Sequence, residues 1–151
     1  MRLWHYMMIG YLPDSQLKAQ KRECDLIWKD IKQGKKTNHI LINYIWNYKD
    51  VEYRLSIYYA QLKKEFELRK FKFVDKSTGI KASWEYTEFS YCAFEEHNFS
   101  YLQQCYYNLQ EKYERGQKDF DNKKYFRLTL LYDKMKEVYF EILGQTDDIK
   151  N

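Results

Sequence analysis

The sequence predicts one irregular all-α domain of about four main helices, and three observations lead to this prediction. The 151 residues include one proline and five glycines, so few residues interrupt a helix. Apolar residues recur at intervals of three or four along several long stretches, which is the period of an amphipathic helix. No repeat, low-complexity tract or linker divides a chain whose length suits one domain. We therefore expect a single domain over residues 1–151, with a frayed tail from about residue 145.

The first helix is expected to run from Asp14 to Lys32. Asp14 follows the only proline of the chain and suits an N-cap, and Gly34 suits a stop soon after the helix. At about 100° per residue, one stripe of this helix is apolar. We expect this stripe in the core, and its members are Leu17, Cys24, Ile27, Trp28 and Ile31.

The same helix carries a cationic sector. Its members are Lys18, Lys21, Arg22, Lys29 and Lys32. Glu23 lies apart from them, at the far border of the apolar stripe. Residues 1–36 hold eight Lys and Arg against four Asp and Glu, and this net charge of +4 equals that of the whole chain. Such a patch suits a polyanionic partner, and the alternative is an ordinary solvated helix face.

The middle of the chain is expected to contain a second helix. Residues 39–48 are apolar and aromatic without clean periodicity, so they form either an extended connection or a short buried helix. The second helix is expected to begin after Asp50, whose short polar side chain suits an N-cap, and to end near Phe71. Its apolar positions are Val51, Leu55, Tyr59, Leu62 and Phe66. The Asp-Lys-Ser-Thr-Gly run within residues 71–83 is the strongest loop signal.

The carboxyl-terminal part is expected to hold two more helices. Residues 84–94 form either a turn-rich aromatic segment or a short helix. Asn98 can cap a third helix that ends at Gly116, with apolar positions Leu102, Cys105, Tyr106 and Leu109. A fourth helix is expected from about Asn122 to Leu143, with Gly144 as its stop. Its apolar positions include Phe126, Leu130, Val138 and Ile142.

The composition sets limits on the class of protein. The 16 Tyr, 9 Phe and 4 Trp predict an aromatic core whose polar tips need partners. Cys24, Cys92 and Cys105 form no CxxC pair and cannot all be disulfide-bonded, so we expect them reduced, in a cytoplasmic protein. No apolar run approaches the roughly 18 residues of a membrane span, and no signal peptide is indicated.

The histidines do not predict a metal centre. His5, His39 and His97 suit packing and hydrogen bonding better than metal ligation, and Cys92 near His97 does not complete a zinc ligand set. We therefore expect neither a metal nor another cofactor.

The order of several motifs resembles a known family. MRLWH opens the chain, L-x-A-x-x-R-E spans Leu17–Glu23, GKK follows the first helix, and YRLSIYYAQLKKEFELRKF covers Tyr53–Phe71. In this order and spacing they resemble the pyrimidine-dimer DNA glycosylase and abasic-site lyase family of the phage endonuclease V type. Weaker matches at His97 and at NLQEK (Asn108–Lys112) extend the resemblance over roughly residues 1–115. The resemblance implies an all-α fold whose amino terminus lies against the first long helix, at the surface that meets DNA.

The resemblance also implies a DNA repair mechanism in which glycosylase and abasic-site lyase activities are coupled. The α-amine of Met1 is the expected nucleophile at the sugar C1′, and Glu23 is the expected catalytic carboxylate. Attack forms a covalent imine, and elimination then cuts the strand. General chemistry agrees, because an α-amine loses its proton near about pH 8, well below a lysine, and a carboxylate can stabilise a developing sugar cation and relay protons.

The expected partner is damaged double-stranded DNA. By resemblance, Arg2 and Arg22 contact the DNA. The lysines of the cationic sector are expected to contact phosphates, and they are Lys18, Lys21, Lys29 and Lys32. We expect a monomer that is cytoplasmic and associated with the nucleoid when it is on DNA.

The amino terminus departs from the family pattern. Relatives use the amine of a threonine exposed by methionine removal, whereas here Met1 takes that place. Removal requires a small second residue, so Arg2 should keep Met1 in place once its formyl group is removed. Gln16 and Asn108 replace a family histidine and arginine, and the aromatic-glycine carboxyl-terminal segment is not matched. The preferred lesion therefore stays open between a cyclobutane dimer, an oxidised or alkylated base, and an abasic site.

Two other functions stay open at this point. A non-catalytic relative would bind duplex DNA without a covalent intermediate. A helical interaction protein would dock its basic helix on an acidic partner, although this leaves the spacing of Arg22-Glu23 from the amino terminus unexplained.

Overall fold

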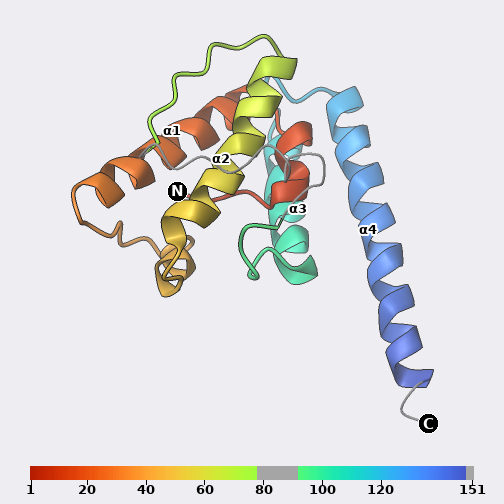
Figure 1. Cartoon of the computed structure of the whole chain (residues 1–151). Coiled ribbons are helices and arrows are strands. Elements are labelled where there is room, and N and C mark those ends of the chain that lie inside the picture. The colour runs from red at the N-terminus through yellow and green to blue at the C-terminus, as the bar shows by residue number, and fades with distance from the viewer. Residues whose placement is uncertain (78–91, 149–151) are drawn as a thin grey trace. The chain divides into compact units, whose positions relative to one another are not determined.

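The protein is helical, as the sequence predicts. A computed structural model describes residues 1–77 and 92–148, the last three of these without their side chains (Figure 1). Its elements are the 3-10 helices η1 (Tyr6–Tyr11) and η2 (Asn43–Asn47) and the α-helices α1 (Asp14–Lys32), α2 (Val51–Leu68), α3 (Phe99–Glu114) and α4 (Asn122–Asp148). The four expected helices are therefore present. Among the described residues, no helix is long and apolar enough to cross a membrane.

The chain divides into two compact units, residues 1–97 and residues 98–151. The single domain expected from the sequence stays a prediction. In the first unit α1 packs against α2, and η1 and η2 also contact α2. The expected stripe of α1 is buried at Leu17, Cys24, Ile27 and Trp28, whereas Ile31 is half-buried. The stripe of α2 is likewise buried from Leu55 onward, so the periodic pattern located this core correctly.

Two local predictions need correction in the first unit. The N-cap of α1 is Pro13, and Asp14 is instead the first helical residue. The helix α2 ends at Leu68 rather than near Phe71. There Lys70 adopts a left-handed conformation with φ of 58°, and the Phe71 N–H donates to the Phe66 carbonyl at 2.8 Å, as in a Schellman motif. The Lys70 N–H also donates to the Glu67 carbonyl at 3.0 Å, and these two hydrogen bonds close the helix without the glycine that usually marks such an end.

The two irregular regions also have clear outcomes. Residues 39–48 contain the short helix η2, whose Ile45 is fully buried, so the helical alternative is the better description. The helix η1 was not predicted. For residues 84–94, residues 84–91 lie outside the described part of the chain, and residues 92–94 are not helical.

The second unit pairs α3 with α4. The Asn98 side chain accepts a hydrogen bond from the Tyr101 N–H at 3.1 Å, which confirms the expected cap. Stacked tyrosine rings join the helices, with centroids 4.1 Å apart for Tyr106 and Tyr132 and 4.0 Å for Tyr113 and Tyr125. The expected apolar positions of α3 are buried. This interface is thus largely aromatic, as the composition predicts.

The helix α4 differs from its prediction. It continues through Gly144 to Asp148, so the expected stop at Gly144 is wrong, whereas the frayed tail expected from about residue 145 stays a prediction. A glycine inside a helix costs only about 1 kcal/mol relative to alanine, and no proline follows it. The buried residues of α4 are Leu128 and Tyr132, whereas Phe126 and Leu130 are 61% and 53% exposed. The apolar positions chosen from sequence therefore lie mainly off the face that packs on α3.

Candidate active site

The amino-terminal segment is fastened to α1 and α2 by Gln20. The amide N–H of Trp4 donates to Gln20 Oε1 at 2.6 Å, and Gln20 Nε2 donates to the carbonyl of Arg2 at 2.9 Å. The hydroxyl of Tyr58 donates to the same Oε1 at 2.9 Å and to the Trp4 carbonyl at 2.8 Å. Leu3 between them is fully buried. Because N–H and carbonyl groups of this backbone are both hydrogen-bonded, residues 2–4 are held along α1.

This fixation places Glu23 next to the chain end. Glu23 Oε2 accepts hydrogen bonds at 3.2 Å from the Arg2 amide N–H and at 3.2 Å from Gln20 Nε2. The Met1 nitrogen and the Arg2 nitrogen are joined through two backbone atoms, at most about 3.7 Å apart. The α-amine therefore lies within about 7 Å of the Glu23 carboxylate oxygen. The structure thus brings together the two residues that were expected to perform the chemistry.

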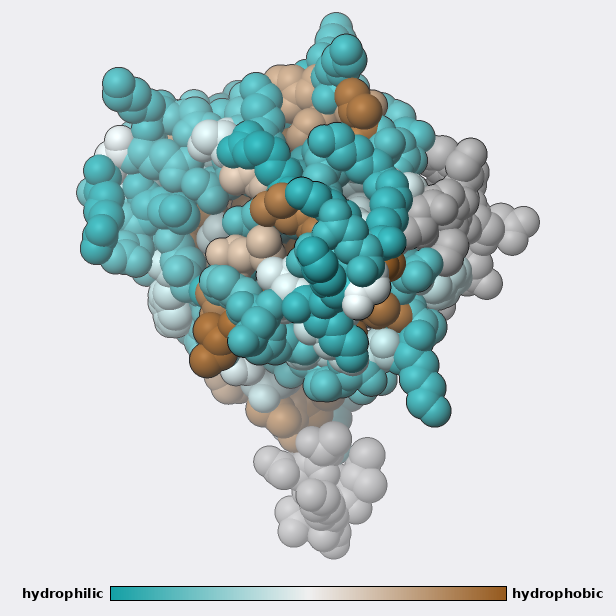
Figure 2. Space-filling view, turned by 90° about the vertical axis from the view of Figure 1, so that its left-hand side faces the viewer, coloured by the Kyte–Doolittle hydropathy of each residue, from teal (hydrophilic) through white to brown (hydrophobic). Residues whose placement is uncertain are grey.

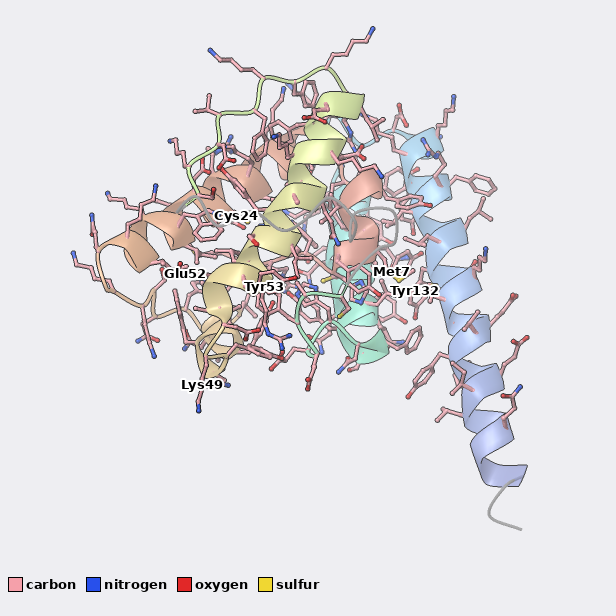
Figure 3. All side chains as sticks on the ribbon, viewed as in Figure 1. Met7, Cys24, Lys49, Glu52, Tyr53 and Tyr132 are labelled. Atoms are coloured by element: carbon pink, nitrogen blue, oxygen red, sulfur yellow. The ribbon has the colours of Figure 1, made fainter. Side chains whose placement is uncertain are left out.

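The burial of Cys24 on α1 explains why the neighbouring Glu23 faces away from the core. Cys24 lies on α1 where that helix approaches α2 (Figure 3), and it is fully buried. Burial raises the pKa of its thiol well above the ordinary value, with a further rise from the neighbouring Glu23 and Asp25 carboxylates. One residue earlier on the helix, Glu23 is rotated by about 100° and is half-exposed. Cys24 therefore packs in the core while Glu23 remains open to a substrate.

The α-amine of Met1 has a second neighbour. Its nitrogen lies 3.4 Å from His39 Nε2. His39 belongs to the connection between α1 and η2, where its Nδ1 accepts from the Leu41 N–H at 3.3 Å and its own N–H donates to Asn43 Oδ1 at 2.8 Å. We expected His39 to serve in packing and did not identify it as a site residue. No local signal could have found it, because the contact spans 38 positions in the sequence.

An open hollow of about 460 Å³ adjoins Glu23. It is lined by Ala19, Arg22, Glu23, Asp25, Leu26 and Lys76. A second hollow of about 480 Å³ shares Asp25, Leu26 and Lys76 with the first and extends along α1 to Lys29, Lys32 and Gln33. The Glu23 carboxylate therefore lines a surface depression that continues along α1 to Lys29 and Lys32.

Most of the expected DNA-binding residues are available at the surface. Lys18, Arg22, Lys29 and Lys32 are exposed, and Arg2 is half-buried with its guanidinium 5.4 Å from the centre of the Trp4 ring. The end of the first unit where α1 finishes lies at the left of Figure 1 and faces the viewer in Figure 2, where the surface is mainly hydrophilic. This surface can approach a polyanion without burying a large apolar area.

Lys21 does not belong to the exposed cationic face. It is buried, with its ammonium 2.7 Å from Asp25 Oδ2 and donating to the Val74 carbonyl at 2.7 Å. The Tyr59 hydroxyl also donates to Asp25, at 2.7 Å. The helical wheel assigned Lys21 to the surface because it describes α1 alone, whereas the segment after α2 covers this side. The expectation that Lys21 is exposed to contact phosphates is corrected accordingly.

Two buried histidines, His5 and His97, hold the amino-terminal segment in place through hydrogen bonds. His5 Nε2 donates to the His97 carbonyl at 2.7 Å, the Tyr6 N–H donates to His97 Nδ1 at 3.3 Å, and His97 Nε2 donates to the Tyr44 hydroxyl at 2.8 Å. Burial lowers the pKa of His5 to about 4, and burial together with His5 lowers the pKa of His97 to about 3. Both imidazoles are therefore neutral and structural. Among the described residues, no three His, Cys, Asp or Glu side chains are grouped to hold a metal ion.

Comparison with known proteins identifies the family of the chain. A family model described as pyrimidine dimer DNA glycosylase matches residues 1–78, just over half of the chain. The chain belongs to the pyrimidine dimer DNA glycosylase family. This match confirms the family resemblance seen in the sequence. As a member of this family, the protein is a DNA repair glycosylase whose substrate is DNA. The matched residues include both Met1 and Glu23. No curated protein and no solved structure matches the chain.

Proposed function

We propose that this protein is a DNA glycosylase with a coupled abasic-site lyase activity, and that the α-amine of Met1 is its nucleophile. One observation carries the proposal: the Arg2 N–H donates to Glu23, which holds the amine within about 7 Å of the carboxylate oxygen. A sugar C1′ placed between them meets a nucleophile on one side and a negative charge on the other. Holding both groups in place before the substrate arrives removes an entropic part of the barrier.

The proposed reaction begins at the glycosidic bond. The amine lone pair forms a bond to C1′ while the C1′–N bond breaks, and its electron pair leaves with the base, which takes up a proton. Glu23 stabilises the positive charge that develops on the sugar. The nitrogen then loses a proton, its lone pair forms the C=N bond as the C1′–O4′ bond breaks, and O4′ keeps that electron pair and takes up a proton, so that an imine joins Met1 to the sugar.

The strand is cut in a second stage. A base removes a proton from C2′, and the electron pair expels the 3′ phosphate, so that one C–O bond breaks and a C–C double bond forms. We assign this step to Glu23, because its carboxylate accepts from the Arg2 N–H beside the proposed nucleophile. Water then hydrolyses the imine and frees the amine. No cofactor is needed for electron balance, because no atom is oxidised or reduced by an external partner.

DNA binding is proposed to involve the exposed basic residues around Glu23. Arg22 lines the hollow beside the carboxylate, and Lys29 and Lys32 line its continuation along α1. Arg2 and Lys18 add charge near the chain end and the start of α1. Each phosphate neutralised on duplex DNA contributes a slope of about −0.9 to the dependence of log K on log salt. We propose that the protein acts as a monomer on damaged double-stranded DNA.

Borohydride trapping tests the proposal. Tag-free protein, with an unformylated Met1 verified by mass spectrometry, is mixed with a duplex that contains one abasic site or one cyclobutane dimer. The expected product is an adduct on Met1 that disappears when the α-amine is acetylated. Comparison of the two duplexes identifies the lesion that the enzyme accepts.

Glu23→Gln is the matched variant for this experiment. It keeps an oxygen that accepts from the Arg2 N–H but removes the charge, so we expect strand cleavage to fall at least about 100-fold while DNA affinity is retained. If neither duplex yields an adduct from the unblocked wild type, the mechanism is refuted. Retained DNA affinity would then favour a non-catalytic DNA-binding relative, and its loss would favour a protein-interaction module.

A further inference from the structure

The connection between α1 and η2 (Figure 1) contains a tight turn whose tip is apolar. The Ile42 N–H donates to the His39 carbonyl at 2.9 Å and closes a four-residue turn, with Ile40 and Leu41 as its central residues. Central turn positions usually hold Gly, Pro, Asn, Asp or Ser, because these residues suit the backbone of a turn. Ile40 is 86% exposed, more than any other large apolar side chain among the described residues, and Leu41 is 37% exposed. The turn therefore presents a large apolar group to solvent.

Hydrogen bonds hold this turn in place. The side chain of Asn43 accepts from the His39 N–H at 2.8 Å and donates to Asn38 Oδ1 at 3.1 Å. The turn also ends on Ile42, which is fully buried. Ile40 is thus positioned by the folded chain before a partner arrives, so little conformational freedom is lost when it makes a contact.

The turn lies beside the amino-terminal amine. Nε2 of His39, its first residue, is 3.4 Å from the Met1 nitrogen. One imidazole side chain and one Cα–Cα step of about 3.8 Å lead from that contact to Ile40, so the Ile40 Cα lies within about 12 Å of the amine. Successive nucleotides of a strand are about 3.4 Å apart, so Ile40 meets a duplex within about four base pairs of the sugar that the amine reaches. Three exposed lysines precede the turn, and they are Lys32, Lys35 and Lys36.

From this placement we propose that Ile40, supported by Leu41, is an apolar wedge that enters the base stack of duplex DNA at the lesion. The inference rests on the proposed function, because a glycosylase takes its target nucleotide out of the stack and leaves a gap there. Apolar side chains inserted between base steps hold a duplex open and kinked. Opening costs least where a base is damaged or missing, so the wedge favours damaged over intact DNA. Ile40 is then a residue for lesion recognition.

Three variants test this role. Ile40→Ala removes most of the wedge, whereas Ile40→Leu keeps its apolar volume. Leu68→Ala is the matched control, because Leu68 is another exposed apolar side chain of the first unit, at 69%, and ends α2. Since both positions are exposed, melting curves should equal that of the wild type. Every variant retains Met1 and Glu23.

The first measurement is DNA affinity by fluorescence anisotropy, on an intact duplex and on one that contains a tetrahydrofuran residue. This abasic-site analogue lacks the C1′ hydroxyl and cannot form an imine, so the result does not depend on the nucleophile. We expect the wild type to prefer the analogue, and Ile40→Ala to reduce that preference about tenfold, because it withdraws apolar surface from the gap. Its affinity for the intact duplex and its salt slope should stay unchanged. Ile40→Leu and Leu68→Ala should behave as the wild type.

The second measurement reports on the base stack itself. A 2-aminopurine placed opposite the tetrahydrofuran residue fluoresces more strongly when it is unstacked. Saturating wild-type protein should raise this fluorescence, and saturating Ile40→Ala should raise it much less. The two proteins are compared at full occupancy, so a difference in affinity does not affect the result.

The outcomes separate the wedge from the proposed chemistry. Equal preference for the analogue in wild type and Ile40→Ala would overturn the wedge, and so would an equal loss of affinity for both duplexes. A borohydride adduct on Met1 together with either of these results would leave the proposed function standing. A preference that depends on Ile40 without any adduct would support the wedge and refute the imine mechanism. A wild type that binds neither duplex would overturn both.

Discussion

Acidification should destabilise the protein through its two buried histidines. His5 and His97 are each 3% exposed, and each ring accepts a backbone N–H at Nδ1, from Met7 and Tyr6 respectively. Each Nε2–H is already a donor, to the His97 carbonyl or to the Tyr44 hydroxyl. A second proton on either ring would face an N–H group and would break that hydrogen bond. The folded state therefore resists protonation, in agreement with the lowered pKa values of about 4 and about 3.

The sign and size of the effect follow from proton linkage. In the unfolded chain a histidine has a pKa near about 6.5, so below that pH the unfolded state binds more protons. The stabilisation is complete above about pH 6.5 and is lost as the pH falls toward the folded-state values. At about pH 5.5 each imidazole has lost about 1.4 kcal/mol, so the pair lowers the free energy of unfolding by about 3 kcal/mol. This is a large part of the 5–15 kcal/mol or so that stabilises a typical domain.

Urea unfolding at pH 7.5 and pH 5.5 measures this difference. The interval lies above the ordinary range of carboxylate titration, so Asp and Glu contribute little. Tryptophan fluorescence and circular dichroism should report the same transition if unfolding is two-state. The variant that carries both His5→Gln and His97→Gln is the control and should lose most of the pH dependence, although its stability at pH 7.5 will be lower. If the wild-type free energy of unfolding were equal at the two pH values, the linkage argument would be refuted.

Three further outcomes follow from named contacts. Gln20→Leu should destabilise the protein by about 2–3 kcal/mol, because it leaves buried polar partners unpaired. It should also slow borohydride trapping more than the loss of folded protein seen in a melting curve explains. Equal trapping rates would show that catalysis does not need the hydrogen bonds of Gln20 to the amino-terminal segment. Lys29→Ala should weaken DNA binding and reduce the salt slope by about 1, whereas Lys21→Ala should lower thermal stability, because it removes the lysine that pairs with Asp25. Anisotropy titrations at several salt concentrations measure the first effect, and melting curves measure the second. The reverse pattern would contradict the exposed position of Lys29 and the buried position of Lys21. Gly144→Ala should stabilise α4 by about 0.5–1 kcal/mol, because an added methyl group meets nothing within 4 Å; calorimetry checks this, and a destabilised variant would argue against a continuous helix at this position.

The sequence located most of the helices because their signals are local. A buried stripe repeats with the helical period whatever the rest of the chain does, so α1, α2 and α3 were found with small errors at their ends. The errors arose where two local signals compete. Gly144 resembled a stop but lies inside α4, and Lys70 closes α2 in a conformation that usually selects glycine.

The candidate site was only partly predictable. Met1 and Glu23 were named from the order of motifs, and the family match extends over both. Gln20 gave a weaker signal, as a polar residue three positions after Leu17 and four before Cys24, on the side of α1 that the structure buries. His39 gave none, because nothing in its neighbourhood records a contact with a residue 38 positions earlier.

By itself, the sequence determined the helical class, the apolar stripes of the helices and the family, since each depends on residues that are close together or in a fixed order. Only the tertiary structure decided that the Arg2 amide reaches Glu23, that His39 contacts the amine and that Lys21 is buried. The physical reason is the same in each case. Helical periodicity fixes where a side chain lies around its own axis, whereas the segment that packs against it is selected by the folding of the whole unit.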